Sequence, residues 1–115
     1  MAVRTHVAPQ PELITFLLSE MPPETAVTAR RFFGGWELLT AARQFAIVMK
    51  GTLYFKVDGA IRAEMERQGC RPFSYATAKR QVSVPKYMSA PEGSLDDIEL
   101  LQDWVRRVTA VSAEP

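Results

Sequence analysis

The chain has 115 residues, of which 47% are hydrophobic and 23% charged, with 14 Lys and Arg against 13 Asp and Glu. This composition is typical of one soluble globular domain and excludes a disordered chain. Charged residues interrupt every apolar stretch before the roughly 20 residues of a membrane-spanning helix. The N-terminus lacks the apolar core of a secretory signal, and the single cysteine, Cys70, cannot form an internal disulfide. We therefore expect a cytoplasmic protein with no membrane contact.

The first predicted element is a helix that follows a loose arm over residues 1–9. Pro11 suits the first helical position, where the missing N–H would have no intrahelical partner. Apolar side chains then recur at helical spacing as far as Met21. Pro22 and Pro23 end the helix, because proline cannot continue its backbone hydrogen bonds.

From residue 26 onward the apolar residues alternate, as they do in a half-buried strand. Gly34 and Gly35 break this strand at a point that suits a positive φ, and an extended run resumes at Trp36. We expect Phe33 to fill the core at this bend. Trp36 fits the core and the surface equally well.

Residues 44–50 and 53–57 form the clearest pair of strands. Apolar side chains alternate in both, and Lys50-Gly51-Thr52 between them supplies a tight turn. Residues 40–43 form the connecting turn before this pair.

A short helix is predicted over about residues 60–68, with Asp58 at its N-cap. Two more strands follow at 73–75 and 81–87. Pro85 cannot donate a ladder hydrogen bond, so it belongs at a sheet edge or a bulge. An edge position would let the strand over 81–87 pair with a second copy, and we expect a dimer.

The last predicted element is a helix that opens at a capping box over Ser94–Asp97. The order helix, three strands, helix, two strands, helix predicts the α+β class, with one antiparallel sheet of about five strands and helices on a face. We expect a single domain over 10–110 and a tail over 111–115. The predicted core contains Leu17, Phe45, Ile47, Leu53, Phe55, Ile98, Leu101 and Val105.

Charge is unevenly distributed along the chain. Residues 25–90 carry eleven basic and four acidic side chains, whereas residues 91–115 carry two basic and six acidic ones. The basic middle could face a polyanion, or the acidic C-terminal segment could fold over it and neutralise it. We favour the second interpretation, because dedicated nucleic-acid-binding domains usually have a far higher isoelectric point.

No residue pattern indicates catalysis. The chain has one histidine, His6, in the predicted arm, and Cys70 has no predicted base beside it. No glycine-rich phosphate motif or nucleophile elbow occurs. We therefore predict no catalytic residue, no metal site, no cofactor and no enzymatic activity.

Surface residues are the remaining functional candidates. The run from Arg30 to Trp36 places two guanidinium groups beside aromatic rings, and both residue types are enriched at interfaces. The predicted interaction surface comprises Arg30, Arg31, Gly34, Gly35, Trp36 and Arg43. A predicted basic patch that would bind nucleic acid weakly comprises Arg71, Lys79, Arg80 and Lys86.

Five motifs follow one another along the chain, namely Arg30-Arg-Phe-Phe-Gly-Gly-Trp36, Phe45-Ala-Ile-Val48, Leu53-Tyr-Phe-Lys-Val-Asp58, Arg71-Pro-Phe-Ser-Tyr75 and Tyr87-Met-Ser-Ala-Pro91. From about Leu13 to Val108, this ordered series resembles the N-terminal domain of the TfoX/Sxy regulators of bacterial competence. The chain departs from the family pattern at Thr40–Arg43, where the family has a glycine-containing turn, and at Pro85.

The resemblance implies a two-layer α+β fold similar to the type III secretion chaperones, without catalytic or ligand residues. It also implies transcriptional co-activation alongside the cyclic-AMP receptor protein. Full-length regulators carry a second helical domain, which we do not expect within these 115 residues. We therefore expect a non-enzymatic regulatory domain that binds a protein partner, such as a transcription factor, or a second copy of itself. The alternative is a weak nucleic-acid-binding module that uses the basic middle segment.

Overall fold

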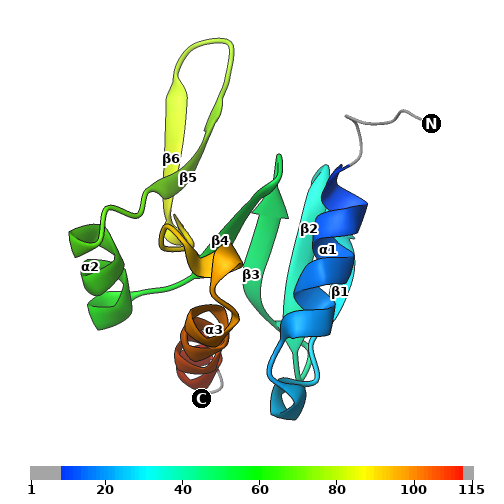
Figure 1. Ribbon diagram of the computed structural model, residues 1–115. Coiled ribbons are helices and arrows are strands. Elements are labelled where there is room, and N and C mark those ends of the chain that lie inside the picture. Colours follow the sequence, from blue (N-terminus) through cyan, green and yellow to red (C-terminus); the bar gives the residue numbers. More distant parts are fainter. Residues whose placement is uncertain (1–8, 113–115) are drawn as a thin grey trace.

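Three α-helices and six antiparallel strands make up the fold in a computed structural model that describes residues 9–112. The predicted α+β class is confirmed, with the element order α-β-β-β-β-α-β-β-α (Figure 1). The elements are α1 (Pro9–Glu20), β1 (Thr28–Phe32), β2 (Gly35–Thr40), β3 (Arg43–Met49), β4 (Thr52–Lys56), α2 (Gly59–Arg67), β5 (Pro72–Ala76), β6 (Gln81–Ser89) and α3 (Ile98–Ser112). Two short 3-10 helices are η2 (Pro23–Thr25) and η3 (Ser94–Asp96).

The strands form one sheet in the order β1-β2-β3-β4-β6-β5. Six strands occur instead of about five because the predicted bend at Gly34 is a hairpin turn that separates β1 from β2. Phe33 has a φ of 46° and Gly34 a φ of 82°, as the tight turns that join twisted strands require. The turn directs Phe33 outward, and its side chain is 85% exposed. The expectation that Phe33 fills the core was therefore wrong.

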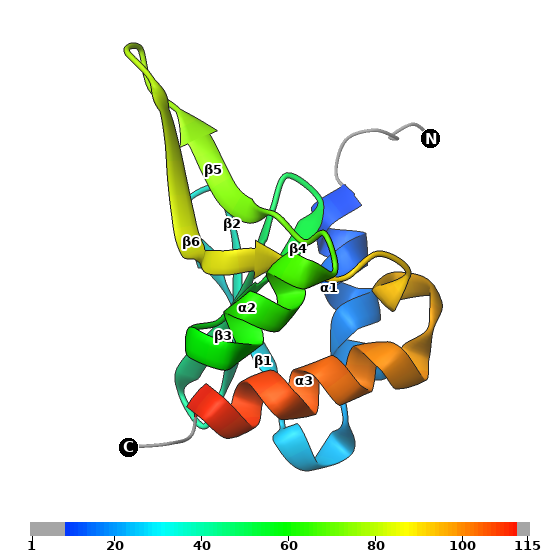
Figure 2. The same ribbon diagram turned by 90° about the vertical axis from the view of Figure 1, so that its left-hand side faces the viewer.

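The three α-helices pack on one face of the sheet and close a single core. Figure 2 shows them gathered on one side, while the β5–β6 hairpin rises away from them. Leu17 of α1, Met65 of α2 and Trp104 of α3 are fully buried in this core, which includes Leu38 and Phe55 of the sheet. Of the eight predicted core residues, only Ile98 is not buried; it is half-buried at the first position of α3.

A β-bulge in β3 decides which side chains face the helices. Ala46 lies opposite Leu38 and Gln44 lies opposite Leu39, so Phe45 is an extra residue on β3. Phe45 and Ala46 consequently both belong to the core under the helices. Ile47 is buried as predicted, but it is not part of that core, because it follows Ala46 on the opposite face of the strand.

The last helix begins later than the predicted capping box implies. Ser94 lies in η3, where its hydroxyl donates to the carbonyl oxygen of Pro91 at 2.6 Å. Asp97 is the residue that caps α3, since its Oδ1 accepts a hydrogen bond from the Leu100 N–H at 3.2 Å. At the other predicted cap, Asp58 stands at the N-cap of α2 but makes no capping hydrogen bond through its side chain.

None of the helices within residues 9–112 is both long enough and apolar enough to cross a membrane. The predicted arm and tail fall largely on residues 1–8 and 113–115, which lie outside the described residues.

Candidate functional site

The face of the sheet turned away from the helices, here called the open face, is marked by a row of paired residues. Glu37 lies opposite Ile47, which lies opposite Tyr54, and Tyr54 lies opposite Ser89. Directly paired residues point to the same side of an antiparallel sheet, so these four side chains share one face. None of them belongs to the core under the helices.

The β5–β6 hairpin bends over the open face because β6 changes partner along its length. Residues 81–84 pair only with β5, whereas Tyr87–Ser89 pair with β4. Pro85 lies between the two segments, at the irregular stretch of the ladder, as predicted for a bulge. Figure 2 shows β6 turning sharply between its two halves. The expected edge position of this strand was wrong, since β6 lies between β4 and β5 and the edge strand is β5.

A groove of about 530 Å³, here called the apolar groove, lies between this hairpin and the β1–β2 turn. One wall comes from the hairpin and the other from the end of β1, with β3 between them. Most of the lining is aromatic or aliphatic. The lining residues are Phe32, Phe33, Ile47, Met49, Phe73, Tyr75, Val84, Lys86 and Tyr87.

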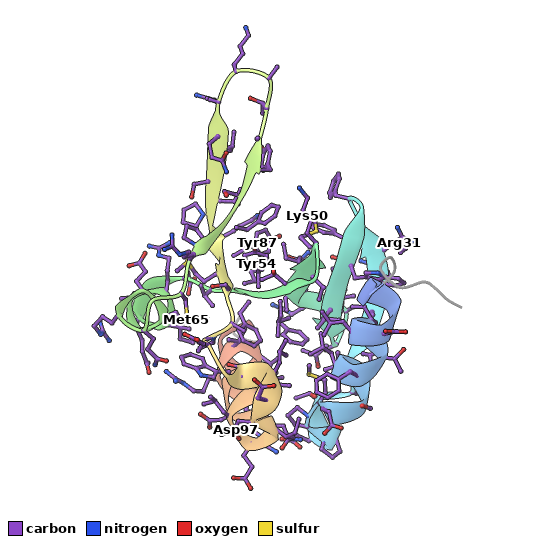
Figure 3. All side chains as sticks on the ribbon, turned by 45° about the horizontal axis from the view of Figure 1, so that its top comes forward. Arg31, Lys50, Tyr54, Met65, Tyr87 and Asp97 are labelled. Atoms are coloured by element: carbon purple, nitrogen blue, oxygen red, sulfur yellow. The ribbon has the colours of Figure 1, made fainter. Side chains whose placement is uncertain are left out.

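Aromatic rings dominate both walls of the apolar groove. Phe32 and Phe33 meet edge to face at a centroid distance of 4.8 Å, and Tyr54 and Phe73 do so at 5.2 Å. Phe33 on one wall and Tyr75, 47% exposed, on the other are two of the three exposed large hydrophobic side chains in the described region. In Figure 3, Tyr54, Tyr87 and Lys50 gather between the hairpin and the β1–β2 strands.

A chain of hydrogen bonds fixes Tyr87 on the open face. Its hydroxyl donates to Gln44 Oε1 at 2.7 Å, and Gln44 Nε2 donates to Glu37 Oε1 at 2.8 Å. Arg30 completes the chain by donating from Nε to Glu37 Oε2 at 3.0 Å. Burial raises the pKa of Glu37, but the bonds from Arg30 and Gln44 outweigh it, so the pKa lies below its ordinary value. Glu37 is therefore a buried carboxylate whose charge is already compensated.

One basic side chain lines the apolar groove, and two more belong to residues that adjoin its lining: Lys50 follows Met49, and Lys56 pairs with Tyr87. Lys86 lies in the lining, with its ammonium 5.3 Å from the centre of the Tyr87 ring. Lys50, in the β3–β4 turn, and Lys56, at the end of β4, are both exposed. From Cys70 to Pro91 the sequence has four basic residues and no acidic one. The charged side chain in the lining, Lys86, and those of the adjoining residues Lys50 and Lys56 are therefore cationic.

The structure does not bring the predicted interaction surface together. Arg30 and Arg31 are neighbours on β1 and point to opposite faces. Arg30 forms an ion pair with Glu37 at 2.8 Å on the open face, whereas the Arg31 guanidinium lies 5.1 Å from the Trp36 ring centre. Trp36 is half-buried and packs against the core, so it combines the two roles that the sequence left open.

The remaining members of that surface are turn and strand residues. Gly34 is exposed in the β1–β2 turn. Gly35 is buried, and a Cβ there would lie 2.3 Å from the Val48 carbonyl oxygen. Arg43 pairs with Thr40 at the opposite end of β2 from Gly35. None of these three residues lines the apolar groove, although Gly34 follows the lining residue Phe33 and Gly35 pairs with the lining residue Phe32.

The predicted basic patch lies on a single element, the β5–β6 hairpin and its base. Lys79 and Arg80 stand in the loop at the tip, where Thr77 Oγ1 accepts their backbone N–H groups at 3.2 and 3.1 Å. Arg71 marks the base, and Lys86 lies at the bend of β6. The four charges are spread along the hairpin and do not form one compact cluster.

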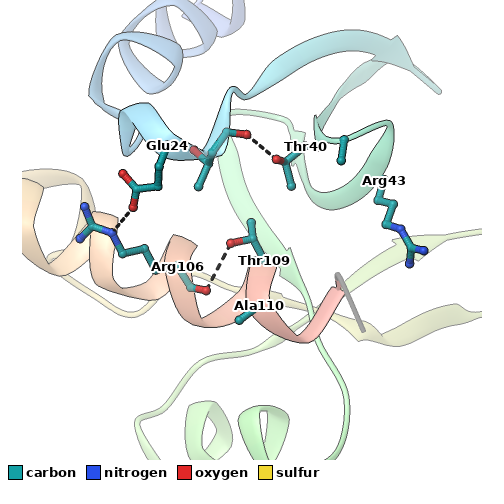
Figure 4. A pocket seen from close by; sticks show the side chains of 8 residues that line it. Glu24, Thr40, Arg43, Arg106, Thr109 and Ala110 are labelled. Carbon is teal, nitrogen blue, oxygen red and sulfur yellow. Dashed lines mark hydrogen bonds and ion pairs between the residues drawn. The ribbon is translucent and has the colours of Figure 1, made fainter. Parts of the chain in front are cut away.

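A second cavity, of about 450 Å³, lies between η2, the β2–β3 turn and α3 (Figure 4). Arg106 Nε donates to Glu24 Oε2 at 2.6 Å, and this bond lowers the pKa of the Glu24 carboxyl. Thr40 donates to the Thr25 carbonyl oxygen, and the Thr109 hydroxyl donates to the Val105 carbonyl oxygen at 2.8 Å. The Arg106–Glu24 bond joins α3 to η2 and the Thr40–Thr25 bond joins β2 to η2, which are structural roles.

Within the described residues no group of three or more His, Cys, Asp and Glu is placed to hold a metal ion. His6 lies outside the described residues. Cys70 is half-buried, and burial raises the pKa of its thiol, which lowers the fraction of reactive thiolate.

Sequence reasoning missed most of the apolar groove. The sequence predicted a strand over residues 73–75, but no prediction was made of the face of the sheet on which Phe73 and Tyr75 lie. In the structure Phe73 pairs with Val84, and Tyr75 with Val82, so one face of the hairpin carries aromatic and aliphatic side chains. The available signal was this alternation on both strands, opposite Ser74 and Ser83 on the other face.

A family model described as the TfoX N-terminal domain covers residues 18–112, nearly the whole chain. No curated protein matches the chain.

Proposed function

Because the chain belongs to the TfoX N-terminal domain family, we propose that it is a non-catalytic regulatory domain that binds a protein partner at the apolar groove. The family is regulatory and generally without catalytic activity. The observation that carries the proposal is the groove itself, whose two walls end in the exposed rings of Phe33 and Tyr75.

The energetics of these two rings support binding. Burying an exposed aromatic side chain releases about 1.5–3 kcal/mol, and aromatic residues supply many of the dominant contacts at protein interfaces. Phe33 also holds a left-handed backbone conformation, which costs a bulky residue roughly 1–3 kcal/mol. A strained and 85% exposed phenylalanine outside the core adds little to folding beyond its edge contact with Phe32, which supports a role of its ring in binding.

The first partner to test is the one that the family resemblance implies, the cyclic-AMP receptor protein. Biolayer interferometry with the two purified proteins should show binding that Phe33→Ala and Tyr75→Ala each weaken about tenfold or more. Leu18→Ala is the matched control, because Leu18 is 37% exposed on α1, outside the groove. Equal binding by all four proteins would exclude the groove as the binding surface.

A second copy of the chain is the other protein partner to examine. β5 is an edge strand over Pro72–Ala76, and edge strands can pair across a two-fold axis. Light scattering at two protein concentrations will give the mass. A dimer that Tyr75→Ala dissociates would identify the second copy as the partner.

Nucleic-acid binding is a second candidate, favoured by the charge of the β5–β6 hairpin. The hairpin and its base carry Arg71, Lys79, Arg80 and Lys86 without an acidic residue. A two-stranded ribbon fits the major groove of DNA, but only a few phosphates would be neutralised, which implies a Kd of roughly 10⁻⁴–10⁻⁶ M. Titration of duplex and single-stranded DNA at 50 and 200 mM salt tests this, with Lys79→Glu/Arg80→Glu as the variant.

A further inference from the structure

We propose that the apolar groove holds an amphipathic helix whose exposed face is acidic. This inference rests on the proposed protein-binding function and adds the chemistry of the segment that the partner must offer. It follows from the form of the groove, from its lining and from its charge.

The form of the groove favours a helix over an extended strand. The groove includes Ile47, in the middle of β3, and β3 is paired on both sides by β2 and β4. A strand in the interior of a sheet has no free backbone groups for strand addition, and the edge strands β1 and β5 have their free backbone groups at the two outer margins of the sheet. What it presents is a face of side chains, and a sheet face is covered by a helix or by another sheet. The face of the sheet opposite the open face is covered by the three α-helices, and the apolar part of the open face offers a place for one more helix.

The lining favours large apolar side chains as anchors. Of its side chains, only Tyr75, Lys86 and Tyr87 carry strongly polar groups. The Tyr87 hydroxyl already donates its hydrogen bond to Gln44, so its proton is not available to a partner. Met49, half-buried at the end of β3, is a side chain that adapts to differently shaped partners. Leu, Phe or Met at helical positions i, i+3 or i+4, and i+7 would bury the exposed rings of Phe33 and Tyr75.

The charge favours an acidic outer face on the helix. Lys86 in the lining and Lys50 and Lys56 on nearby turns and strand ends are exposed cations. Glu37 is the one carboxylate in the chain of hydrogen bonds on the open face, and its negative charge is compensated by Arg30. A helix with Glu and Asp along its edges would complement these cations, and a basic helix would be repelled.

The same lining argues against single-stranded nucleic acid in the groove. Bases need free ring faces for stacking and polar groups for their edges. Here Phe32 presents its ring to Phe33, and Phe73 presents its ring to Tyr54, so neighbouring side chains already use part of the aromatic surface. The polar groups that would contact base edges are few.

Surface display provides the test. Three libraries of 18-residue peptides are selected against the purified full chain: helices with an acidic polar face, helices with a basic polar face, and acidic peptides whose apolar residues lack helical spacing. Binders should come from the acidic helices. Their affinity, measured by fluorescence anisotropy, should fall about tenfold or more with Phe33→Ala or Tyr75→Ala and several-fold with Lys86→Glu.

Matched controls keep the result specific to the groove. Leu18→Ala removes an exposed apolar side chain from α1, and Arg67→Glu reverses an exposed charge on α2. Neither should change the affinity. The proposal is overturned if no library yields a binder, if basic or non-helical peptides dominate, or if the groove variants bind as tightly as the unaltered chain. Tighter binding of labelled oligothymidylate than of the selected helices, with loss in Phe33→Ala, would assign the groove to nucleic acid instead.

The outcomes separate this inference from the proposed function. If the cyclic-AMP receptor protein or a second copy binds in a Phe33-dependent manner and no acidic helix is selected, the groove binds protein and the inference about the segment is wrong. If acidic helices bind in a Phe33-dependent manner while neither of those proteins does, the inference holds and the partner is a different protein.

Discussion

The two faces of the sheet are built from the same kinds of residue but differ in how far those residues are buried. On the face under the helices, Phe55 and Leu38 are fully buried in one continuous core. On the open face, Phe33 and Tyr75 remain exposed above a buried Ile47. Apolar composition alone does not distinguish the two faces. What distinguishes them is whether a helix of the same chain is available to cover the side chains.

The covered face therefore contributes most of the stability of the fold, whereas the open face provides a surface for contact. Removing a buried apolar group from the covered face leaves a cavity, whereas removing an exposed one from the open face, such as the ring of Phe33 or Tyr75, leaves a space that solvent already reaches. The turns differ in the same way, because Gly35 packs against backbone and Gly34 faces open space. Four substitutions test this division, in order of decreasing effect.

The largest effect is expected on the covered face. Phe55→Ala should lower the free energy of unfolding by about 3–5 kcal/mol, because the side chain is fully buried and its removal leaves a cavity. Urea denaturation followed by circular dichroism measures it. Tyr75→Ala, on the open face, is the control and should cost less than about 1 kcal/mol. Similar losses for both would mean that the open face also belongs to the stabilising core.

The second effect concerns the two adjacent glycines. Gly35→Ala should destabilise by about 1–3 kcal/mol, because the added Cβ would lie 2.3 Å from the Val48 carbonyl oxygen, a backbone atom. At Gly34 a Cβ meets no atom within 4 Å, and the cost is limited to the strain of a φ of 82°. Thermal unfolding of both variants should rank Gly35→Ala below Gly34→Ala. The reverse order would contradict the tight packing of β2 on β3.

Much of the fold follows from local patterns in the sequence. The alternation over residues 44–57, with Lys50-Gly51 between, specifies the β3–β4 hairpin, and Pro22-Pro23 ends α1 as expected. The β1–β2 hairpin was harder to predict from the sequence, because a turn that begins with Phe33 at a positive φ is locally unfavourable. Tertiary pairing along the whole of both strands, from Thr28 to Phe32, supports that turn.

The functional surface was harder to predict, because it depends on the order of strands. β5 precedes β6 in the chain, but β6 is the strand that pairs with β4, and no local signal specifies that pairing. The groove also depends on the bulge at Phe45, which moves Ile47 to the open face. Arg30 and Arg31 appeared equivalent in the sequence. Strand alternation places them on opposite faces, where Arg30 pairs with Glu37 and Arg31 packs on the ring of Trp36.

The third effect is a dependence of stability on pH that arises on the open face. Glu37 has a folded-state pKa below its ordinary value of 4.5, so its contribution is present at pH values above about 4.5 and disappears as the pH falls through the folded-state pKa. Glu37→Gln should lower the unfolding free energy by about 1.5 kcal/mol at pH 7. The difference between the two proteins should shrink below pH 4.5.

Denaturation of both proteins at several pH values from 3 to 8 measures this difference. Glu12→Gln is the control, because Glu12 is exposed on α1, away from the Arg30–Tyr87 chain of bonds. A difference between the unaltered chain and Glu37→Gln that stays constant down to pH 3 would mean that the carboxylate is not what Arg30 and Gln44 stabilise.

The smallest effect has the opposite sign and separates stability from binding at one residue. Phe33 adopts a φ of 46°, which asparagine tolerates far better than a bulky residue does. Phe33→Asn should gain about 1 kcal/mol from the relieved strain and lose about 0.5 kcal/mol from the edge contact with Phe32. The net result is a slight rise in unfolding free energy together with weaker binding of a partner at the groove. Phe33→Ala loses the same ring but lacks the short polar side chain that lets asparagine hydrogen-bond locally in the left-handed conformation, so it should weaken binding without any gain in stability. If Phe33→Asn instead destabilises the protein as much as Phe33→Ala does, the ring contributes more to folding than its strain costs. The boundary between the two faces would then have to be moved to include Phe33 in the core.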